Sequence, residues 1–183
     1  MVAAVRRHET QLSLLRGPLI LAVTGHRPDK LGGYCWTCTS RYIARRMEQE
    51  LRALKPDEAI TGMALGVDQW FGWLCVKLGI PFTAAVPFEG QEARWPRAET
   101  RENYHRLLSH AKRVEIVTHL SPEQRRQKSL IDKAMRDRNS WMVARCDRLL
   151  AVWDGSAGGT GNCVREAYRV GRPITQINPR MAA

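Results

Sequence analysis

Long apolar stretches are missing from this sequence of 183 residues. A membrane-spanning helix needs about 18 or more predominantly apolar residues in a row, and no segment approaches that length. The longest apolar run near the start, residues 19–23, is also too short for the hydrophobic region of a secretory signal. We therefore expect a cytoplasmic protein that makes no membrane contact.

Cysteine is scarce, and its arrangement argues against a disulfide framework. The chain has five cysteines, an odd number, and most of them lie inside apolar patterns. Cys35 and Cys38 have the spacing of half a zinc site or of a redox pair, but no second pair of cysteines or histidines has a matching spacing. We expect reduced thiols and no bound metal, with a zinc ion shared between two copies as the alternative.

Acidic residues are few relative to basic ones. The 18 Asp and Glu residues stand against 29 Lys and Arg, which gives a formal net charge of +11. This excess favours an anionic partner, because Lys and Arg gain free energy by displacing the counterions of phosphates. The basic residues are scattered among acidic ones and form no long run. The charge therefore indicates an anion without choosing between a nucleic acid and a small molecule.

Short apolar runs alternate with segments of helical periodicity along the chain. The apolar runs predict six strands, at residues 19–23, 58–61, 82–86, 114–117, 149–153 and 174–177. The periodic segments predict helices at about residues 40–54, 68–78, 104–111, 130–144 and 161–170. Most of the strands are continuously apolar, which is typical of a parallel sheet covered on both faces. We predict one doubly wound α/β domain at residues 18–183, preceded by an N-terminal arm at residues 1–17.

Three loops at the carboxyl ends of the predicted strands, where such sheets bind their ligands, have an unusual composition. The first holds Thr24, Gly25, His26 and Arg27. Gly25 lets the backbone approach a ligand closely, and His26 and Arg27 are suited to contact phosphate or ribose. The alternative is a tight turn with two exposed basic side chains.

The second loop, residues 61–68, contains Gly62 and Gly66 and ends at Asp68, where the next helix is predicted to begin. The two glycines predict a backbone-lined bend before a helix N-terminus, where free N–H groups favour an anion. We expect Asp68 either to cap its helix or to contact a ribose hydroxyl. The alternative is that both glycines serve packing alone.

The third loop is the richest in glycine, with four glycines between Asp154 and Asn162. Glycine loses more conformational freedom on folding than any other residue, so such a cluster is costly. A flexible loop tip is the alternative explanation for two of the four glycines. Gly158, Gly159 and Thr160 open the next helix, an arrangement that fits the cradling of a phosphate by backbone N–H groups. No Lys follows the last glycine, so this is no Walker A motif, and no GxGxxG motif follows the first strand.

Five segments together resemble the YpsA-like branch of the SLOG superfamily, which is related to DprA and to the LOG phosphoribohydrolases. They are TGHRPDKLGGY, ITGMALGVDQW, AVPFEGQEARWP, RNSWMV and DRLLAVWDGSAGGTGNCVREA. The resemblance covers about residues 19–177 and implies a Rossmann-like sheet that binds nucleotides or nucleotide-derived ligands. The positions that match the family's motifs are Thr24, Gly25, Arg27, Gly62, Gly66, Asp68, Arg138, Asn139, Gly158, Gly159 and Thr160.

The sequence departs from the resemblance at the residue that LOG enzymes use for cleaving an N-glycosidic bond. Aligning the glycines of the third loop places Arg165 at the position of their Glu, and Glu166 follows one residue late, which turns its side chain by about 100° on a helix. Glu89 and Glu92, after the third strand, are the other carboxylate candidates. Trp95 in the same loop is a candidate for stacking on a base, with burial as the alternative.

We expect a protein that binds a nucleotide or a nucleotide-derived small molecule at the carboxyl edge of the sheet and requires no cofactor. Gly158, Gly159 and Thr160 would hold its phosphate, and His26 and Asp154 join the ligand-binding candidates. By resemblance, Arg27 and Arg138 would balance the phosphate charge, Asn139 would orient the loop, and the protein would self-associate. Two alternatives stay open, namely a LOG-type nucleoside-monophosphate hydrolase or transferase and a DprA-like single-stranded nucleic-acid binder.

Overall fold

The computed structural model describes residues 17–182. Nearly all of the predicted N-terminal arm, residues 1–16, lies outside the described residues. The strands are β1 (Ile20–Gly25), β2 (Glu58–Thr61), β3 (Phe82–Val86), β4 (Arg113–Ile116), β5 (Arg148–Val152) and β6 (Ile174–Ile177). The helices are α2 (Cys38–Leu54), α3 (Val67–Leu78), α4 (Ala98–Leu108), α5 (Lys128–Arg145) and α6 (Gly159–Arg169), with short 3-10 turns η1 (Pro28–Lys30), η2 (Gln124–Arg126) and η3 (Pro179–Met181).

The strands form one sheet in the order β4-β3-β2-β1-β5-β6, and every neighbouring pair is parallel. From β1 to β4 the chain adds strands in one direction, and it then returns through α5 to place β5 beside β1. The sheet therefore has a topological switch point between β1 and β5, where doubly wound proteins leave a crevice for a ligand. The predicted Rossmann-like, doubly wound α/β domain is confirmed.

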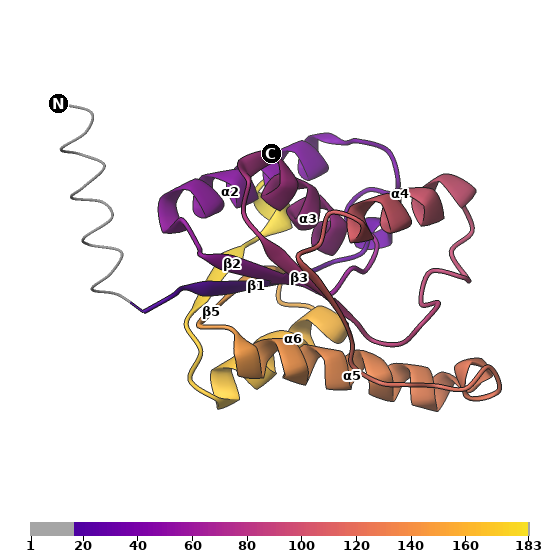
Figure 1. Ribbon diagram of the computed structural model, residues 1–183. Coiled ribbons are helices and arrows are strands. Elements are labelled where there is room, and N and C mark those ends of the chain that lie inside the picture. Colours follow the sequence, from indigo (N-terminus) through magenta and orange to yellow (C-terminus); the bar gives the residue numbers. More distant parts are fainter. Residues whose placement is uncertain (1–16, 183) are drawn as a thin grey trace, which may run out of the picture.

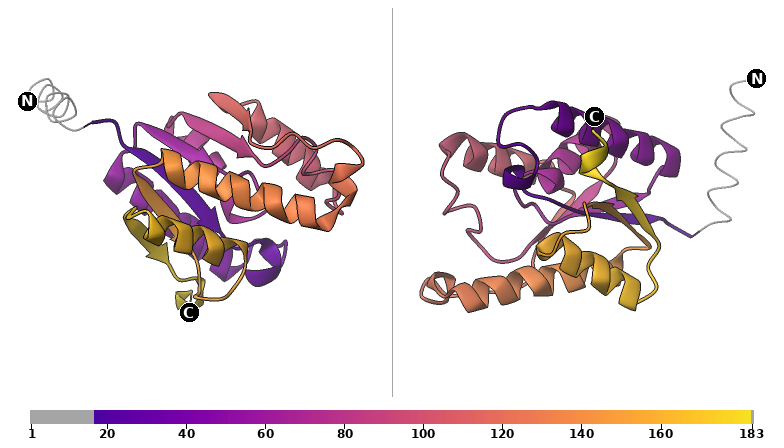
Figure 2. Two further views of the ribbon diagram at one scale, coloured as in Figure 1. Left: turned by 90° about the horizontal axis from the view of Figure 1, so that it is seen from below. Right: turned by 180° about the vertical axis from the view of Figure 1, so that it is seen from behind.

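Helices cover both faces of this sheet, as Figure 1 and the two further views in Figure 2 show. Helices α2, α3 and α4 lie on one face, and α5 and α6 lie on the other. Side chains of β1 alternate between the two layers, because successive residues of a strand point to opposite faces. Leu21 and Val23 pack into the core beneath α2 and α3, whereas Ala22 packs into the core beneath α5 and α6.

The apolar runs of the sequence correspond closely to the strands. The predicted strands at residues 58–61, 82–86 and 174–177 have the observed bounds. Helix α4 starts at Ala98, six residues before the first apolar residue of its predicted stripe. Its first turns carry mostly charged and polar side chains on the surface, so hydrophobic periodicity could not find them.

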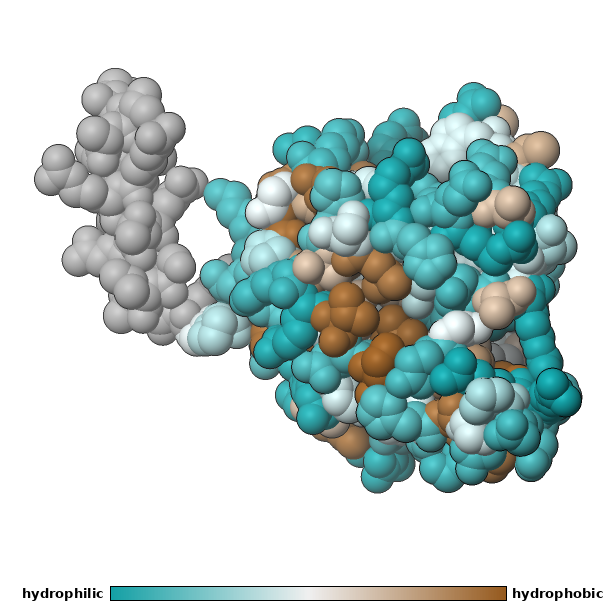
Figure 3. All heavy atoms as spheres, turned by 45° about the vertical axis from the view of Figure 1, so that its right-hand side comes forward, coloured by the Kyte–Doolittle hydropathy of each residue, from teal (hydrophilic) through white to brown (hydrophobic). Residues whose placement is uncertain are grey.

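No helix in the described part of the chain is apolar over enough residues to span a membrane. Hydrophilic residues cover most of the face shown in Figure 3, around a smaller apolar patch.

A candidate anion-binding site at the switch point

A cavity of about 430 Å³ opens at the carboxyl ends of β1 and β5. Four segments line it: the loop after β1, the loop after β2, the middle of α5 and the glycine-rich start of α6. Of the residues predicted from the sequence, it brings together Thr24, Gly25, His26, Arg27, Asp68, Arg138, Asn139, Gly158, Gly159 and Thr160. The switch point thus collects residues from loops that are far apart in the sequence.

The N-terminus of α6 is open toward this cavity. Helix α6 begins at Gly159, its N-cap Gly158 has a φ of 138°, and no side chain caps the helix. The backbone N–H groups of Gly159, Thr160 and Gly161 accordingly have no acceptor among residues 17–182. Unpaired N–H groups at a helix N-terminus carry partial positive charge and favour an anion.

Lys30 holds the glycine-rich loop from the side of β1. Its ammonium donates to Ser156 Oγ at 3.0 Å and to the carbonyl of Ala157 at 3.3 Å. The same ammonium lies 3.8 Å from where a Cβ on Gly158 would stand. A positive charge therefore sits next to the free N–H groups of α6.

Asp154 joins the loop after β1 to the loop after β5. Its Oδ1 lies 2.8 Å from Nε2 of the buried His26 and accepts the N–H of Ser156 at 3.0 Å, while Arg180 donates to Oδ2 at 2.9 Å. The hydrogen bonds from Ser156, and then those from His26 and Arg180, hold the pKa of Asp154 well below its usual range. Asp154 itself does not line the cavity, so the geometry gives it a positioning role.

Arg138 is buried beneath the cavity and already bonded within the protein. Its guanidinium donates to the carbonyl of Gly62 and lies 3.4 Å from Asp68 Oδ2, and its Nε donates to Asn139 Oδ1 at 3.0 Å. Asn139 in turn donates to the carbonyl of Gly159 at 3.2 Å. This chain of contacts connects the loop after β2 with the start of α6, and it neutralises much of the charge that Arg138 would offer to a ligand.

Asp68 is the second residue of α3, so the prediction that it caps the helix is wrong, and Gly66 takes the N-cap position. Its carboxylate instead accepts the N–H of Ala64 at 3.3 Å and faces Arg138. Burial raises the pKa of Asp68, while the Arg138 charge and the Ala64 N–H act in the opposite direction. The alternative prediction, a contact with ribose, stays a prediction.

The glycines of the first two loops are enclosed by protein atoms. A Cβ on Gly25 would stand 2.4 Å from Val67 Cγ1, and one on Gly62 would stand 1.6 Å from the Arg138 guanidinium. Gly66 has a φ of 94°, and a Cβ there would stand 2.8 Å from the carbonyl of His26. Close packing explains these three glycines, and neither Gly62 nor Gly66 lines the cavity at the switch point.

The three glutamates proposed as catalytic candidates lie away from this cavity. Glu166 is bound by Arg169 on the outside of α6, and this contact lowers its pKa. Hydrogen bonds from its own backbone N–H and from His119 lower the pKa of Glu89. Glu92 faces His105 at 3.3 Å, and its second carboxylate oxygen is buried without a partner.

Four charged residues of the cavity were not singled out in the sequence analysis, namely Asp29, Lys30, Asp132 and Arg136. The last two precede Asn139 on α5 by seven and three residues, a spacing that places all three on one face of a helix. This helical spacing is the sequence signal that could have identified Asp132 and Arg136 as cavity residues. The side chain of Arg136 makes no hydrogen bond or ion pair within residues 17–182, so its charge is free to meet a ligand.

The cysteines divide into exposed and buried ones. Cys35 and Cys38 are exposed, whereas Cys75, Cys146 and Cys163 are buried. Burial raises the pKa of the Cys75 and Cys163 thiols to about 12, so both stay protonated and unreactive at neutral pH. Across residues 17–182, no three His, Cys, Asp or Glu side chains form a group able to hold a metal ion.

Comparison with known proteins agrees with the resemblance seen in the sequence. The chain is 30% identical over 131 residues to the SPbeta prophage-derived protein YoqJ of Bacillus subtilis. The alignment covers 66% of this chain and 75% of YoqJ. Among solved structures, DNA processing protein A (DprA) of Streptococcus pneumoniae aligns with a TM-score of 0.60 at 18% identity, over 91% of this chain and 52% of DprA, so this chain spans about half of DprA. The molybdenum cofactor binding protein of Rippkaea orientalis aligns with a TM-score of 0.53 at 18% identity, over 87% of this chain and 76% of that protein.

At these identities the solved structures show a shared fold. The profile of the family described as "YspA SLOG family" matches residues 21–173, which is most of the chain and includes every loop that lines the cavity. The chain belongs to this SLOG family, named YpsA.

Proposed function

We propose that this protein binds a phosphorylated, nucleotide-type small molecule in the cavity at the switch point. The observation that carries the proposal is the uncapped N-terminus of α6, whose free N–H groups open into the same cavity as three basic side chains besides the buried, ion-paired Arg138. Those side chains are Arg27, Lys30 and Arg136. A phosphate is the ligand group that combines high negative charge with several acceptor oxygens, so it suits such donors best.

Gly159 supports the same proposal from its surroundings. It has no positive φ, and a Cβ added to it would meet nothing within 4 Å. The fold therefore gives no reason for glycine at this position, whereas close approach of a ligand to the backbone would. The cavity volume of about 430 Å³ also lies in the range of small-molecule sites, about 300–1,000 Å³.

The names of the structural neighbours add support of a general kind. One is a DNA processing protein and another is a molybdenum cofactor binding protein. The fold is thus used in proteins connected with nucleic acid and with a small cofactor, and the geometry of this cavity favours a small ligand here.

The test is thermal stabilisation by a panel of NAD, ADP-ribose, mononucleotides, cyclic nucleotides and pyrophosphate. A ligand present at a hundredfold over its Kd adds about 2.7 kcal/mol of stability, which is a rise in Tm of roughly 5–11 °C for a chain of this size. The Arg136→Ala variant should lose most of this rise. Arg126→Ala is its matched control, because Arg126 is also exposed and basic but lies outside the cavity. A panel without any stabilising compound would contradict the proposal.

A second candidate function is hydrolysis of the N-glycosidic bond of a nucleoside monophosphate, and one observation favours it. Asp68 lines the cavity, and burial raises its pKa, as is common for a carboxyl group that donates a proton to a leaving base. Release of free base from nucleoside monophosphates by the wild type, lost in Asp68→Asn, would support hydrolysis. Ligand binding without base release would leave binding as the function.

A further inference from the structure

A second cavity, of about 580 Å³, lies beside the first at the same edge of the sheet. The two are separated by the loops after β1 and β2, and adjacent residues of these loops line opposite cavities. Arg27 and Ala64 line the first cavity, whereas Pro28 and Leu65 line the second. Because consecutive Cα atoms are only 3.8 Å apart, the divide between the two cavities is narrow.

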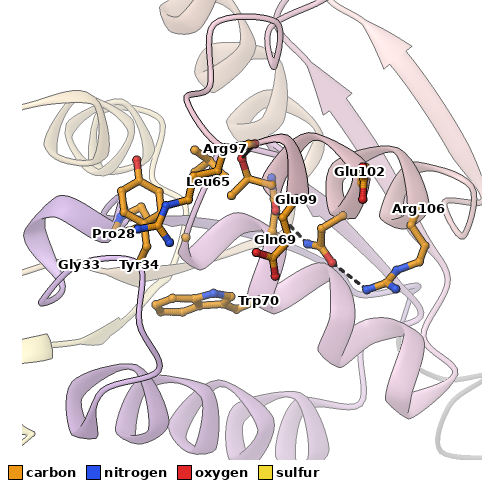
Figure 4. Close-up of a pocket in the computed structure, with 13 residues that line it drawn as sticks. Pro28, Gly33, Tyr34, Leu65, Gln69, Trp70, Arg97, Glu99, Glu102 and Arg106 are labelled. Atoms are coloured by element: carbon orange, nitrogen blue, oxygen red, sulfur yellow. Dashed lines mark hydrogen bonds between the residues drawn. The ribbon is translucent and has the colours of Figure 1, made fainter.

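Flat side chains form one side of this second cavity, which Figure 4 shows in close-up. Tyr34 is 45% exposed, and the guanidinium of Arg97 lies 4.8 Å from the centre of its ring. Trp70 is half-buried and is held by an edge-on contact with Trp36, with ring centres 5.5 Å apart. Aromatic rings and guanidinium planes are the surfaces on which nucleobases stack.

Amide and carboxylate groups form the opposite side. The amide of Gln69 is buried, accepting from Asn103 at 3.3 Å and donating to the carbonyl of Met63 at 3.4 Å. Glu99 and Glu102 stand on α4 at the cavity, as Figure 4 shows, and neither forms an ion pair with another of residues 17–182. Their oxygens are free to accept hydrogen bonds from the N–H groups at the edge of a base.

The two cavities therefore differ in the charge they can hold. Four basic and three acidic residues line the first cavity, which also offers the free N–H groups of α6 to an anion. Two arginines and two glutamates line the second, where the guanidinium groups of Arg97 and Arg106 already lie over aromatic rings. A base fits the second cavity, and its phosphates fit the first.

We propose that the second cavity binds the nucleobase of the ligand whose phosphates occupy the first. The ligand class is then a nucleoside diphosphate or a longer nucleotide, because the chain between base and terminal phosphate must cross the divide formed by Arg27–Pro28 and Ala64–Leu65. This inference rests on the proposed function and adds the base-binding part of the site.

The experiment is calorimetry of pyrophosphate and of ADP, GDP, CDP and UDP with the wild type and two variants. Tyr34→Ala removes an exposed ring and should weaken the best nucleoside diphosphate about tenfold, since base stacking on an aromatic side chain contributes about 1–3 kcal/mol. Glu99→Gln with Glu102→Gln should also weaken that compound. Neither variant should weaken pyrophosphate. Tyr168→Ala, which removes another exposed tyrosine on the outside of α6, is the control.

Each other outcome has a defined meaning. A wild type that binds neither pyrophosphate nor any nucleoside diphosphate overturns the proposed function and this inference with it. A nucleoside diphosphate that binds Tyr34→Ala and the double Gln variant as tightly as the wild type overturns the inference and leaves the proposed function standing. A thymidine oligonucleotide that loses more affinity than the nucleoside diphosphate in Tyr34→Ala, and gains affinity in the double Gln variant, also overturns it, because the cavity would then serve a polynucleotide.

Discussion

The loops after β2 and after β5 look alike in sequence and differ in what surrounds their glycines. Both leave a strand next to β1, and both open a helix at a glycine N-cap without a side-chain cap. In the loop after β2, Gly62 and Gly66 are enclosed by Arg138 and by the backbone of His26. In the loop after β5, Gly159 faces open space. In the loop after β2 the glycines allow close packing within the protein, and in the loop after β5 Gly159 leaves the space next to the backbone open.

Arg136 and Arg138 show the same contrast, because Arg138 is buried and paired with Asp68 whereas Arg136 is exposed. Replacing each of them by Leu gives the largest expected difference in stability. Arg138→Leu leaves the carboxylate of Asp68 buried without its cation, which costs about 3–5 kcal/mol. Arg136→Leu changes an exposed side chain and should stay within about 0.5 kcal/mol. Urea denaturation of both variants at pH 7 measures the difference.

The loss in Arg138→Leu should shrink as the pH falls toward 4, because protonation removes the buried charge of Asp68. Equal stabilities of the two variants at pH 7 would show that the Arg138–Asp68 contact is not what joins the loops.

The second prediction compares the glycines directly. Gly62→Ala pushes a methyl group into the Arg138 guanidinium and should destabilise the protein by about 1–3 kcal/mol. Gly159→Ala has free space and an ordinary backbone conformation, so it should leave stability unchanged or raise it by up to about 1 kcal/mol.

Gly159→Ala should weaken nucleotide binding, because the added methyl group stands where the ligand would approach the backbone. Thermal denaturation with and without the stabilising nucleotide measures both quantities. The contrast between the loops is lost if Gly159→Ala binds as the wild type does.

The sequence was sufficient for the sheet because burial on both faces makes a strand continuously apolar. The run at Phe82–Val86 is buried at every position, whereas the edge strand Ile174–Ile177 is fully buried only at Ile177. The sequence also located three loops at the correct edge of the sheet. It could not separate glycines that pack from glycines that leave room, because that difference depends on Arg138, 76 residues away from Gly62. For the same reason it did not single out Arg136, which lines the cavity together with Arg138.

A third prediction concerns the contact that holds the two sides of the cavity together. Asp154→Asn keeps the shape of the side chain and removes its charge, which should cost about 1 kcal/mol at neutral pH. Hydrogen bonds from Ser156, His26 and Arg180 hold the pKa of Asp154 below its ordinary value of 3.8. A carboxylate with a lowered pKa contributes stability that is present above the ordinary pKa and is lost as the pH falls through the lowered one.

The stability difference between wild type and Asp154→Asn should therefore be constant from pH 7 to about pH 5 and should decrease below about pH 4. Urea denaturation at pH 7, 5 and 3 measures it. A difference that grows on acidification would contradict the assigned contacts. Lys133→Ala, a change on the outer surface of α5, serves as the control.

The smallest expected effect belongs to Glu166, which follows the open loop in sequence without sharing its space. Glu166 contacts Arg169 on the outside of α6, so Glu166→Gln should shift Tm by less than about 2 °C. It should also leave nucleotide affinity unchanged, because the residue does not line the cavity. Arg136→Ala, tested by the same thermal shift, provides the contrasting loss. If Glu166→Gln did weaken binding, α6 would have to turn so that this side chain enters the cavity, and the open space at Gly159 would no longer be the entrance for the ligand.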